Sequence, residues 1–200
     1  MIRKYNFNPG PATLPLEVLK KMQQELVDYQ DTGMSILETS HRSQEFKDLL
    51  KTTKQNLTEI MELPDGYEIL FLGGGASTQF AMIPMNILGE NQTADYVNTG
   101  AWSKKAIKEA KLFGNVNVAA NGEEYNFGKI PGNFSFTPQA AYVHLTSNNT
   151  IFGTQWKIFP DVGNVPLVVD MSSDIMSRKI DMSQFSLDRK STRLNSSHYS

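Results

Sequence analysis

Residues 68–80, Glu-Ile-Leu-Phe-Leu-Gly-Gly-Gly-Ala-Ser-Thr-Gln-Phe, decide the fold class. The apolar run over 68–72 predicts a short buried strand, and the three glycines after it predict a turn into a helix over about 79–88. Pro84 leaves the length of that helix open. A strand that turns through glycine into a helix is typical of α/β proteins, in which ligands gather where strands end.

The sequence on both sides of this stretch extends the α/β pattern. Upstream, apolar residues spaced three and four apart predict amphipathic helices over about 15–29 and 43–62. Downstream, a helix is predicted over about 103–112, and short apolar runs predict strands over 94–97, 115–119, 140–145 and 165–170. This alternation predicts an α/β fold whose mainly parallel sheet is flanked by helices.

The composition is that of a globular protein that acts on small molecules. The 200 residues are 40% hydrophobic and 20% charged, which is enough for one sizeable core or two small ones. The chain has no cysteine, which excludes disulfides, thiolate metal sites and cysteine nucleophiles and is compatible with a reducing cytoplasm. A net charge of −2 without long runs of one sign argues against nucleic-acid binding.

Membrane insertion and export are not expected. No apolar run approaches the ~20 residues that cross a bilayer, and the N-terminal residues 1–15 contain Asn, Pro and Gly where a signal peptide needs an apolar core. The three histidines lack the spacing of metal ligands, so no metal site is predicted. We therefore expect a cytoplasmic protein.

The glycine-rich turn over 73–78 is the first candidate binding element. Its glycines let the backbone approach a ligand, and the N–H groups at the helix start, with the hydroxyls of Ser77 and Thr78, suit a phosphate. The turn lacks the lysine of a P-loop and the last glycine of a dinucleotide fingerprint, so a nucleotide-binding domain is the least favoured interpretation. A glycine-rich turn without any ligand remains the alternative.

Three further positions carry chemically suggestive side chains. Asp170 ends an apolar run, where its carboxylate could pair with a protonated ring nitrogen or simply cap the next turn. Trp102 could stack on a planar ring or serve as a core anchor. His41 and Arg42 offer a donor fork for a substrate carboxylate, although a solvated pair is the alternative.

The order of these residues resembles the phosphoserine aminotransferases of the class-V pyridoxal-phosphate-dependent family. Each motif is weak alone, but their joint order and spacing over residues 1 to about 185 are specific. The matching stretches are Asn6-Phe-Asn-Pro-Gly-Pro-Ala12, Ser40-His-Arg42, Gly73–Phe80, Ala94–Val97, Gly100–Trp102, Ile107–Ala110, Asn148–Ile151 and Val168–Ser173 with Ser177-Arg178.

The resemblance implies a type I pyridoxal-phosphate transferase fold and one shared cofactor site. It implies that Ala76 and Ser77 bind the cofactor phosphate, that Trp102 stacks on the pyridine ring and that Thr150 contacts its hydroxyl side. Asp170 would keep the ring nitrogen protonated, which makes the ring an electron sink. The implied substrate-binding residues, which receive the carboxylate of glutamate or phosphoserine, are Arg42 and His41.

The resemblance also implies a reaction and an assembly. Family members exchange an amino group between phosphoserine with 2-oxoglutarate and 3-phosphohydroxypyruvate with glutamate, in serine biosynthesis. In bacteria they also act in pyridoxine biosynthesis. They are homodimers in which the second subunit supplies part of the phosphate site, so the expected partners are these small molecules and a second copy.

One departure from the family concerns the reactive lysine. Family members carry a Gly-Ala-Gln-Lys motif whose lysine forms the Schiff base, and this sequence has Leu194 at the corresponding position. We therefore interpret residues 1–185 as a partial large domain with its N-terminal segment and 186–200 as an unrelated, disordered tail. We expect no turnover by this chain and no catalytic residue in it. The alternative function is a non-catalytic fragment that binds phosphate or the cofactor.

Overall fold

The computed structural model describes residues 3–8 and 12–189. Their contacts form two units, the first ending at Ile69 and the second beginning at Leu70, and each is described by itself. Whether the two units together make the single partial domain expected over residues 1–185 stays a prediction. Among the described residues, no helix is long and apolar enough to cross a membrane.

The first unit contains the two predicted amphipathic helices. They are α1 (Leu16–Glu25) and α2 (Gln44–Met61), with a short 3₁₀ helix η1 (Ile36–Glu38) between them. Ser43 caps α2, because its hydroxyl accepts a hydrogen bond from the backbone N–H of Phe46 at 3.3 Å. Both helices confirm the periodicity of the sequence, although α1 ends about four residues earlier than expected.

The second unit alternates helices and strands. Its helices are α3 (Gly75–Ile87) and α4 (Ala101–Ala110), with 3₁₀ helices η2 (Glu123–Tyr125) and η3 (Met182–Gln184). Its strands are β1 (Thr93–Asn98), β2 (Asn115–Asn121), β3 (Val143–Thr146), β4 (Asn148–Asn149), β5 (Thr154–Gln155), β6 (Leu167–Asp170) and β7 (Leu187–Arg189).

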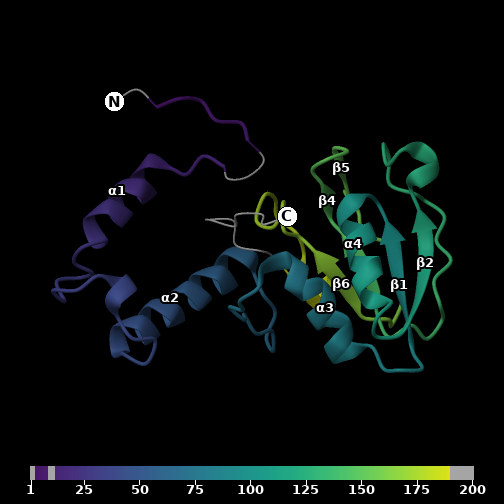
Figure 1. Ribbon diagram of the computed structural model, residues 1–200, viewed down its shortest axis with the longest axis horizontal. Helices are drawn as coiled ribbons and strands as arrows, with labels where there is room; N and C mark the ends of the chain where they lie inside the picture. The colour runs from purple at the N-terminus through teal and green to yellow at the C-terminus, as the bar shows by residue number, and fades with distance from the viewer. Residues whose placement is uncertain (1–2, 9–11, 190–200) are drawn as a thin grey trace. The chain divides into compact units, whose positions relative to one another are not determined.

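Five of these strands form one sheet in the order β2-β1-β3-β6-β7, and every neighbouring pair in it is parallel. Figure 1 shows three of them, β2, β1 and β6, with α4 lying close to β1. The remaining pair, β4 and β5, forms a small antiparallel ribbon. The predicted α/β fold with a mainly parallel sheet flanked by helices is therefore confirmed.

The strand predicted over residues 68–72 is wrong. In the structure this stretch forms no strand, and Leu70, Phe71 and Leu72 expose 69%, 50% and 55% of their surface. An apolar run becomes a strand only when a neighbouring strand accepts its backbone hydrogen bonds, and none of the described strands pairs with it. The following helix starts at Gly75 rather than at about residue 79 and continues through Pro84.

The prediction of a disordered tail from residue 186 is also wrong for the first residues of that segment. Leu187–Arg189 form β7, which pairs with β6 through the register Val168 to Leu187 and Asp170 to Arg189. Backbone hydrogen bonds to an existing strand suffice here, despite the polar side chains. Burial on this strand raises the pKa of Asp188. Residues 190–200 lie outside the described part, and the unrelated origin of 186–200 stays a prediction.

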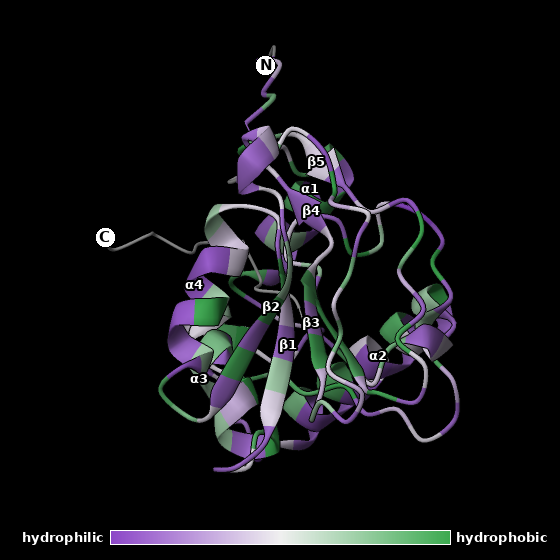
Figure 2. Cartoon of the chain, turned by 90° about the vertical axis from the view of Figure 1, so that its right-hand side faces the viewer, coloured by the Kyte–Doolittle hydropathy of each residue, from purple (hydrophilic) through white to green (hydrophobic). Residues whose placement is uncertain are grey.

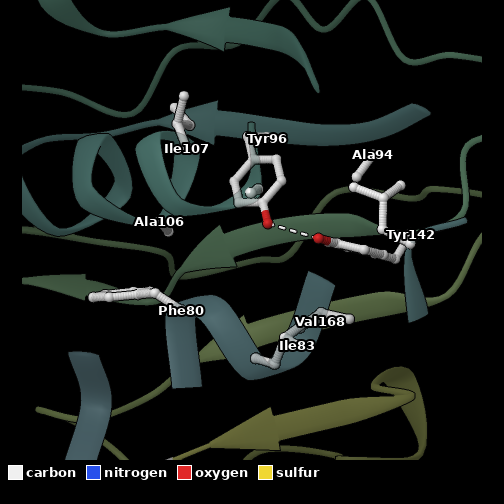
Figure 3. Packing of buried hydrophobic residues seen from close by; sticks show 10 residues of the cluster. Phe80, Ile83, Ala94, Tyr96, Ala106, Ile107, Tyr142 and Val168 are labelled. Atoms are coloured by element: carbon white, nitrogen blue, oxygen red, sulfur yellow. Dashed lines mark hydrogen bonds between the residues drawn. The ribbon is translucent and has the colours of Figure 1, made fainter. Parts of the chain in front are cut away.

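The main core lies between one face of the sheet and the helices α3 and α4. Figure 2 shows α3 and α4 next to each other along the sheet. Figure 3 shows the hydroxyls of Tyr96 and Tyr142 meeting inside this core, 2.7 Å apart. The buried residues of the cluster are Phe80, Ile83, Leu88, Ala94, Tyr96, Ala106, Ile107, Ala110, Tyr142 and Val168.

The opposite face of β1 holds a buried carboxylate. Asp95 is fully buried and accepts hydrogen bonds from the backbone N–H and hydroxyl of Thr137 and from the amide of Asn117. A buried charge of this kind is tolerated because donors satisfy its oxygens. The bonds from Thr137 attach the long connection between β2 and β3 to the sheet.

The phenol of Tyr142 should make the stability of the second unit depend on alkaline pH. Burial raises the pKa of Tyr142 to about 12, so the folded state holds the proton more tightly than the unfolded chain does. The contribution of the Tyr142 proton to the free energy of unfolding should therefore be fully present below about pH 10. The free energy of unfolding should then fall by roughly 2–3 kcal/mol as the pH rises from about 10 to 12.

Urea unfolding at stepped pH values checks this. Tyr142→Phe should remove most of the alkaline loss, whereas Tyr5→Phe, at a residue with 92% exposure, should leave it unchanged. If the free energy of unfolding fell equally with rising pH in Tyr142→Phe and in the unmodified chain, the assignment of this loss to Tyr142 would be contradicted.

Candidate functional site

The carboxyl ends of three parallel strands meet at one edge of the sheet. In register, Tyr96 of β1 is next to His144 of β3, and Thr146 of β3 is next to Asp170 of β6. The rings of Tyr96 and His144 stack at 4.8 Å, which places both on the face that α3 and α4 cover. Because side chains alternate along a strand, Thr146 and Asp170 share that face.

The first turn of α3 carries the predicted phosphate-binding residues. Gly74, the N-cap residue with φ of 92°, has no side chain that could accept from the first N–H groups of the helix. Ala76 and Ser77 follow in the first turn, and Ser77 is exposed. The hydroxyl of Thr78 donates to the carbonyl of Gly74 at 2.8 Å, which steadies the turn. The geometry suits an anion at the helix N-terminus.

The turn before α4 is held by buried hydrogen bonds. The hydroxyl oxygen of Ser103 accepts from the backbone N–H groups of Thr99 and Gly100, each at 2.9 Å. The amide oxygen of Asn98 lies 3.1 Å from the same hydroxyl, as an acceptor for it. Trp102, one residue into α4, is half-buried and packs against the core. Its role as a core anchor is thus visible, and its role in stacking stays a prediction.

Asp170 lies at the carboxyl end of β6 and exposes only 4% of its surface. Its Oδ1 accepts hydrogen bonds from the backbone N–H of Ser172 at 3.0 Å and from the Ser172 hydroxyl at 2.6 Å. The capping role considered from the sequence is therefore present. These bonds also orient the carboxylate, which is what a charged hydrogen bond to a ligand requires.

Thr150 lies in the turn between β4 and β5 and is exposed. The structure ties this turn to the loop of Trp102, because the side-chain amide of Asn149 donates to the carbonyl of Thr99. It also ties the start of β4 to β6, since the backbone N–H of Ser147 donates to the carbonyl of Asp170 at 3.0 Å. The surroundings of Trp102, Thr150 and Asp170 are thus linked by hydrogen bonds.

Two buried hydroxyls at this edge were missed from the sequence. Thr99 and Thr146 expose 1% and 4% of their surface, and their Oγ1 atoms have no hydrogen-bond partner among the described residues. An unpartnered buried hydroxyl is costly, so such atoms favour a ligand that carries polar groups. The sequence signal that could have found them is their place at strand ends. Thr99 comes one residue after β1, and Thr146 is the last residue of β3.

The predicted substrate residues belong to the first unit. His41 and Arg42 lie in an exposed turn just before α2, where the backbone N–H of Arg42 donates to the hydroxyl of Ser40 at 3.2 Å. The structure does not place the first unit relative to the second, so it does not bring these residues to the sheet edge. Their role in binding a carboxylate stays a prediction.

The side chains and helix ends of the second unit would suit a phosphorylated aromatic cofactor. The second unit contains a helix N-terminus without a capping side chain, a half-buried indole, buried hydroxyls and a buried carboxylate. Among the described residues, no group of three His, Asp or Glu side chains could hold a metal ion. This chain's own residues therefore supply groups that would suit a phosphate, a flat ring and a ring nitrogen.

The chain belongs to the aminotransferase class-V family, whose profile matches residues 4–192. The phosphoserine aminotransferase of Desulfatibacillum aliphaticivorans is 58% identical over 186 residues, which are 92% of this chain and 52% of that protein. The chain spans about half the length of the curated relatives that it matches.

Solved structures show the same likeness. The phosphoserine aminotransferase from Bacillus circulans subsp. alkalophilus superposes with a TM-score of 0.90 at 55% identity, over 93% of this chain and 52% of that one. A phosphoserine aminotransferase from Trichomonas vaginalis, solved with bound PLP, gives a TM-score of 0.83 at 36% identity over 92% of this chain and 52% of that one. These similarities confirm the predicted family and fold.

Gly100 should be intolerant of any side chain. Its φ is 149°, and a Cβ placed on it would lie 1.8 Å from the amide nitrogen of Asn149. We expect Gly100→Ala to lower the free energy of unfolding by about 2 kcal/mol or more, through backbone strain and the broken contact. Chemical denaturation followed by tryptophan fluorescence measures this loss.

The matched control is Gly132→Ala, because a Cβ at Gly132 meets nothing within 4 Å and its φ is not positive. This control should change the free energy of unfolding by less than about 0.5 kcal/mol. An equal effect of the two substitutions would show that the turn before α4 is not constrained as described.

Proposed function

We propose that the second unit binds pyridoxal 5′-phosphate and that the chain represents the cofactor-binding part of a phosphoserine aminotransferase. The observation that carries this proposal is Asp170, a buried carboxylate oriented by Ser172 at the carboxyl end of β6. The family membership and the PLP-bound relative support it.

The family resemblance assigns each proposed contact to a residue of the second unit. The N-terminus of α3, with Ala76 and Ser77, would receive the phosphate, since helix N–H groups favour an anion. Trp102 would cover one face of the ring, and Thr150 would contact the side that carries the ring hydroxyl. Asp170 would accept a hydrogen bond from the protonated ring nitrogen.

The carboxylate of Asp170 would favour the protonated form of the cofactor's ring nitrogen. When bound, the cofactor withdraws electrons from the α-carbon of an amino acid, and it does so best with its ring nitrogen protonated. A buried anion favours the protonated form of a ring nitrogen beside it, because the low dielectric strengthens the pairing. Ser172 holds the carboxylate in one orientation for this contact.

The substrates and assembly of the whole enzyme are part of the proposal. Arg42, with His41 beside it, would receive the carboxylate of phosphoserine or glutamate, because a guanidinium matches a carboxylate with two parallel hydrogen bonds. We further propose a homodimer that acts in the cytoplasm, in serine and pyridoxine biosynthesis, without nucleic-acid or membrane partners. The names of the relatives support the substrate class.

Asp170→Asn should weaken cofactor binding while preserving the local fold. Asparagine keeps an oxygen for Ser172 but removes the charge that pairs with the ring nitrogen. Pyridoxamine 5′-phosphate is the appropriate probe, because it lacks the aldehyde that reacts with surface lysines. Loss of one charged hydrogen bond predicts an increase in Kd of roughly 10- to 100-fold, measured by quenching of tryptophan fluorescence.

Asp161→Asn is the matched control. Asp161 is exposed, and its Oδ1 accepts from the backbone N–H of Gly163 at 2.8 Å, which is the same local turn as at Asp170. This variant should bind the probe within about twofold of the unmodified chain. Unchanged binding by Asp170→Asn would defeat the proposed role of Asp170, and no binding by the unmodified chain would defeat the proposed function.

The 200-residue chain should bind the cofactor without turning over. The Gly-Ala-Gln-Lys motif is absent from this sequence, and no other lysine matches its position, so no positioned amine is available to move the substrate proton. A non-catalytic cofactor-binding fragment is therefore the second candidate. Incubation with pyridoxal phosphate, glutamate and 3-phosphohydroxypyruvate should form no phosphoserine above the protein-free rate. Saturable formation of phosphoserine would contradict this expectation.

A further inference from the structure

We propose that Asn149 is a positioning residue that fixes the distance between two turns facing the cofactor ring, the turn that leads into Trp102 and the turn that contains Thr150. This inference rests on the proposed cofactor site and deepens it. The residue is almost fully buried, with 1% of its surface exposed, and it lies at the end of β4.

Both ends of the Asn149 side-chain amide are in use. Its nitrogen donates to the backbone carbonyl of Thr99, 50 residues away in the sequence. Its oxygen accepts from the backbone N–H of Ile151 at 3.3 Å. One side chain therefore connects the loop that follows β1 with the turn that follows β4.

On the β1 side, the bond from Asn149 completes the attachment of the loop. The backbone N–H groups of Thr99 and Gly100 already point to the hydroxyl oxygen of Ser103. Asn149 holds the carbonyl of Thr99, a group that Ser103 does not bind. Gly100 permits this approach, because any Cβ there would overlap the Asn149 amide. The position of Trp102, two residues further along, follows from this attachment.

On the β4 side, Asn149 closes the turn that contains Thr150. The backbone carbonyl of Asn149 accepts from the N–H of Gly153 at 2.8 Å, and its side-chain oxygen accepts from Ile151 within the same turn. Thr150 thus lies between two anchored residues. Its exposed side chain keeps a defined position only while this turn is held.

The amide is the group that this position requires. Asparagine donates and accepts at once, which neither alanine nor aspartate can do. Aspartate would put a carboxylate against the Thr99 carbonyl, and alanine would remove the bridge. By contrast, the phosphate-binding turn of α3 is held locally, through Thr78 and Gly74. Loss of Asn149 should therefore affect the ring contacts and spare the phosphate contacts.

The test compares ligands with and without a ring or a phosphate. It uses the full chain in a Trp156→Phe background, so that Trp102 is the only tryptophan reporter. We expect Asn149→Ala to weaken the binding of pyridoxamine and of pyridoxamine 5′-phosphate by the same factor, about tenfold. Inorganic phosphate, measured by competition, should bind within about twofold of the parent chain.

Asn148→Ala is the matched control. Asn148 neighbours Asn149 on β4, but its amide donates to the hydroxyl of Ser173 at 2.9 Å instead of to the carbonyl of Thr99. Asn148→Ala should bind pyridoxamine, pyridoxamine 5′-phosphate and inorganic phosphate with affinities within about twofold of those of the parent chain. Equal behaviour of the Asn148 and Asn149 variants would overturn the inference, as would an equal loss of phosphate binding in Asn149→Ala, which indicates general damage.

A second variant covers the case in which Asn149→Ala does not fold. Asn149→Ser retains a hydroxyl that can accept from Ile151, as the hydroxyl of Ser40 accepts from the N–H of Arg42, but cannot reach Thr99. It should reproduce the loss of ring binding. Preserved ring binding in Asn149→Ser would overturn the inference.

A ligand-free readout separates this inference from the proposed function. Without the bridge, Trp102 should become more accessible to acrylamide, with a quenching constant about twofold higher in Asn149→Ser than in Asn148→Ala. If the parent chain binds no pyridoxamine 5′-phosphate, the proposed function fails, and this readout alone decides whether Asn149 positions Trp102. Identical quenching in the two variants would then overturn the positioning role as well.

Discussion

The parallel hydrogen-bonded register of β1, β3 and β6 is the constraint on which the candidate site depends. Because these strands run in one direction, the loops that follow them emerge at one edge of the sheet. The alternation of side chains then puts Asp170 and Thr146 on the face that α3 and α4 cover. The site is thus a consequence of strand direction and register more than of any single loop sequence.

At this edge the protein keeps polar groups buried by connecting them across strands. Ser147 joins β4 to the carbonyl of Asp170 and lies within hydrogen-bond reach of the carboxylate of Asp174, which also accepts from Gln155. Asn149 makes the corresponding connection toward β1. Networks of this kind hold a site rigid because each group loses a partner if its neighbour moves. The hydroxyls of Thr99 and Thr146 stay outside the network, which is where a ligand would add bonds.

Local pattern predicted most of the fold, and non-local pairing accounts for what it missed. Apolar periodicity and apolar runs predict the helices, four of the five strands proposed and the strand end at Asp170. The strand predicted over 68–72 was wrong because a strand needs a partner strand, which the composition of the segment does not reveal. The reverse holds for β7, where pairing with β6 makes a strand of a polar segment. Asn149 was named only within a family motif, because its partner Thr99 is distant in the sequence.

The carboxylates of the second unit show why burial alone does not identify a functional group. Asp95 and Asp170 are both almost fully buried, but Asp95 receives hydrogen bonds from Thr137 and Asn117 on the face opposite the core helices. Its role is to hold the connection against β1. Asp170 differs by its place at a strand end, beside the unpartnered hydroxyl of Thr146 and on the face of α3 and α4. Position relative to the sheet edge, together with the polar atoms nearby, therefore distinguishes the carboxylate for which we propose a ligand from the structural carboxylate of Asp95.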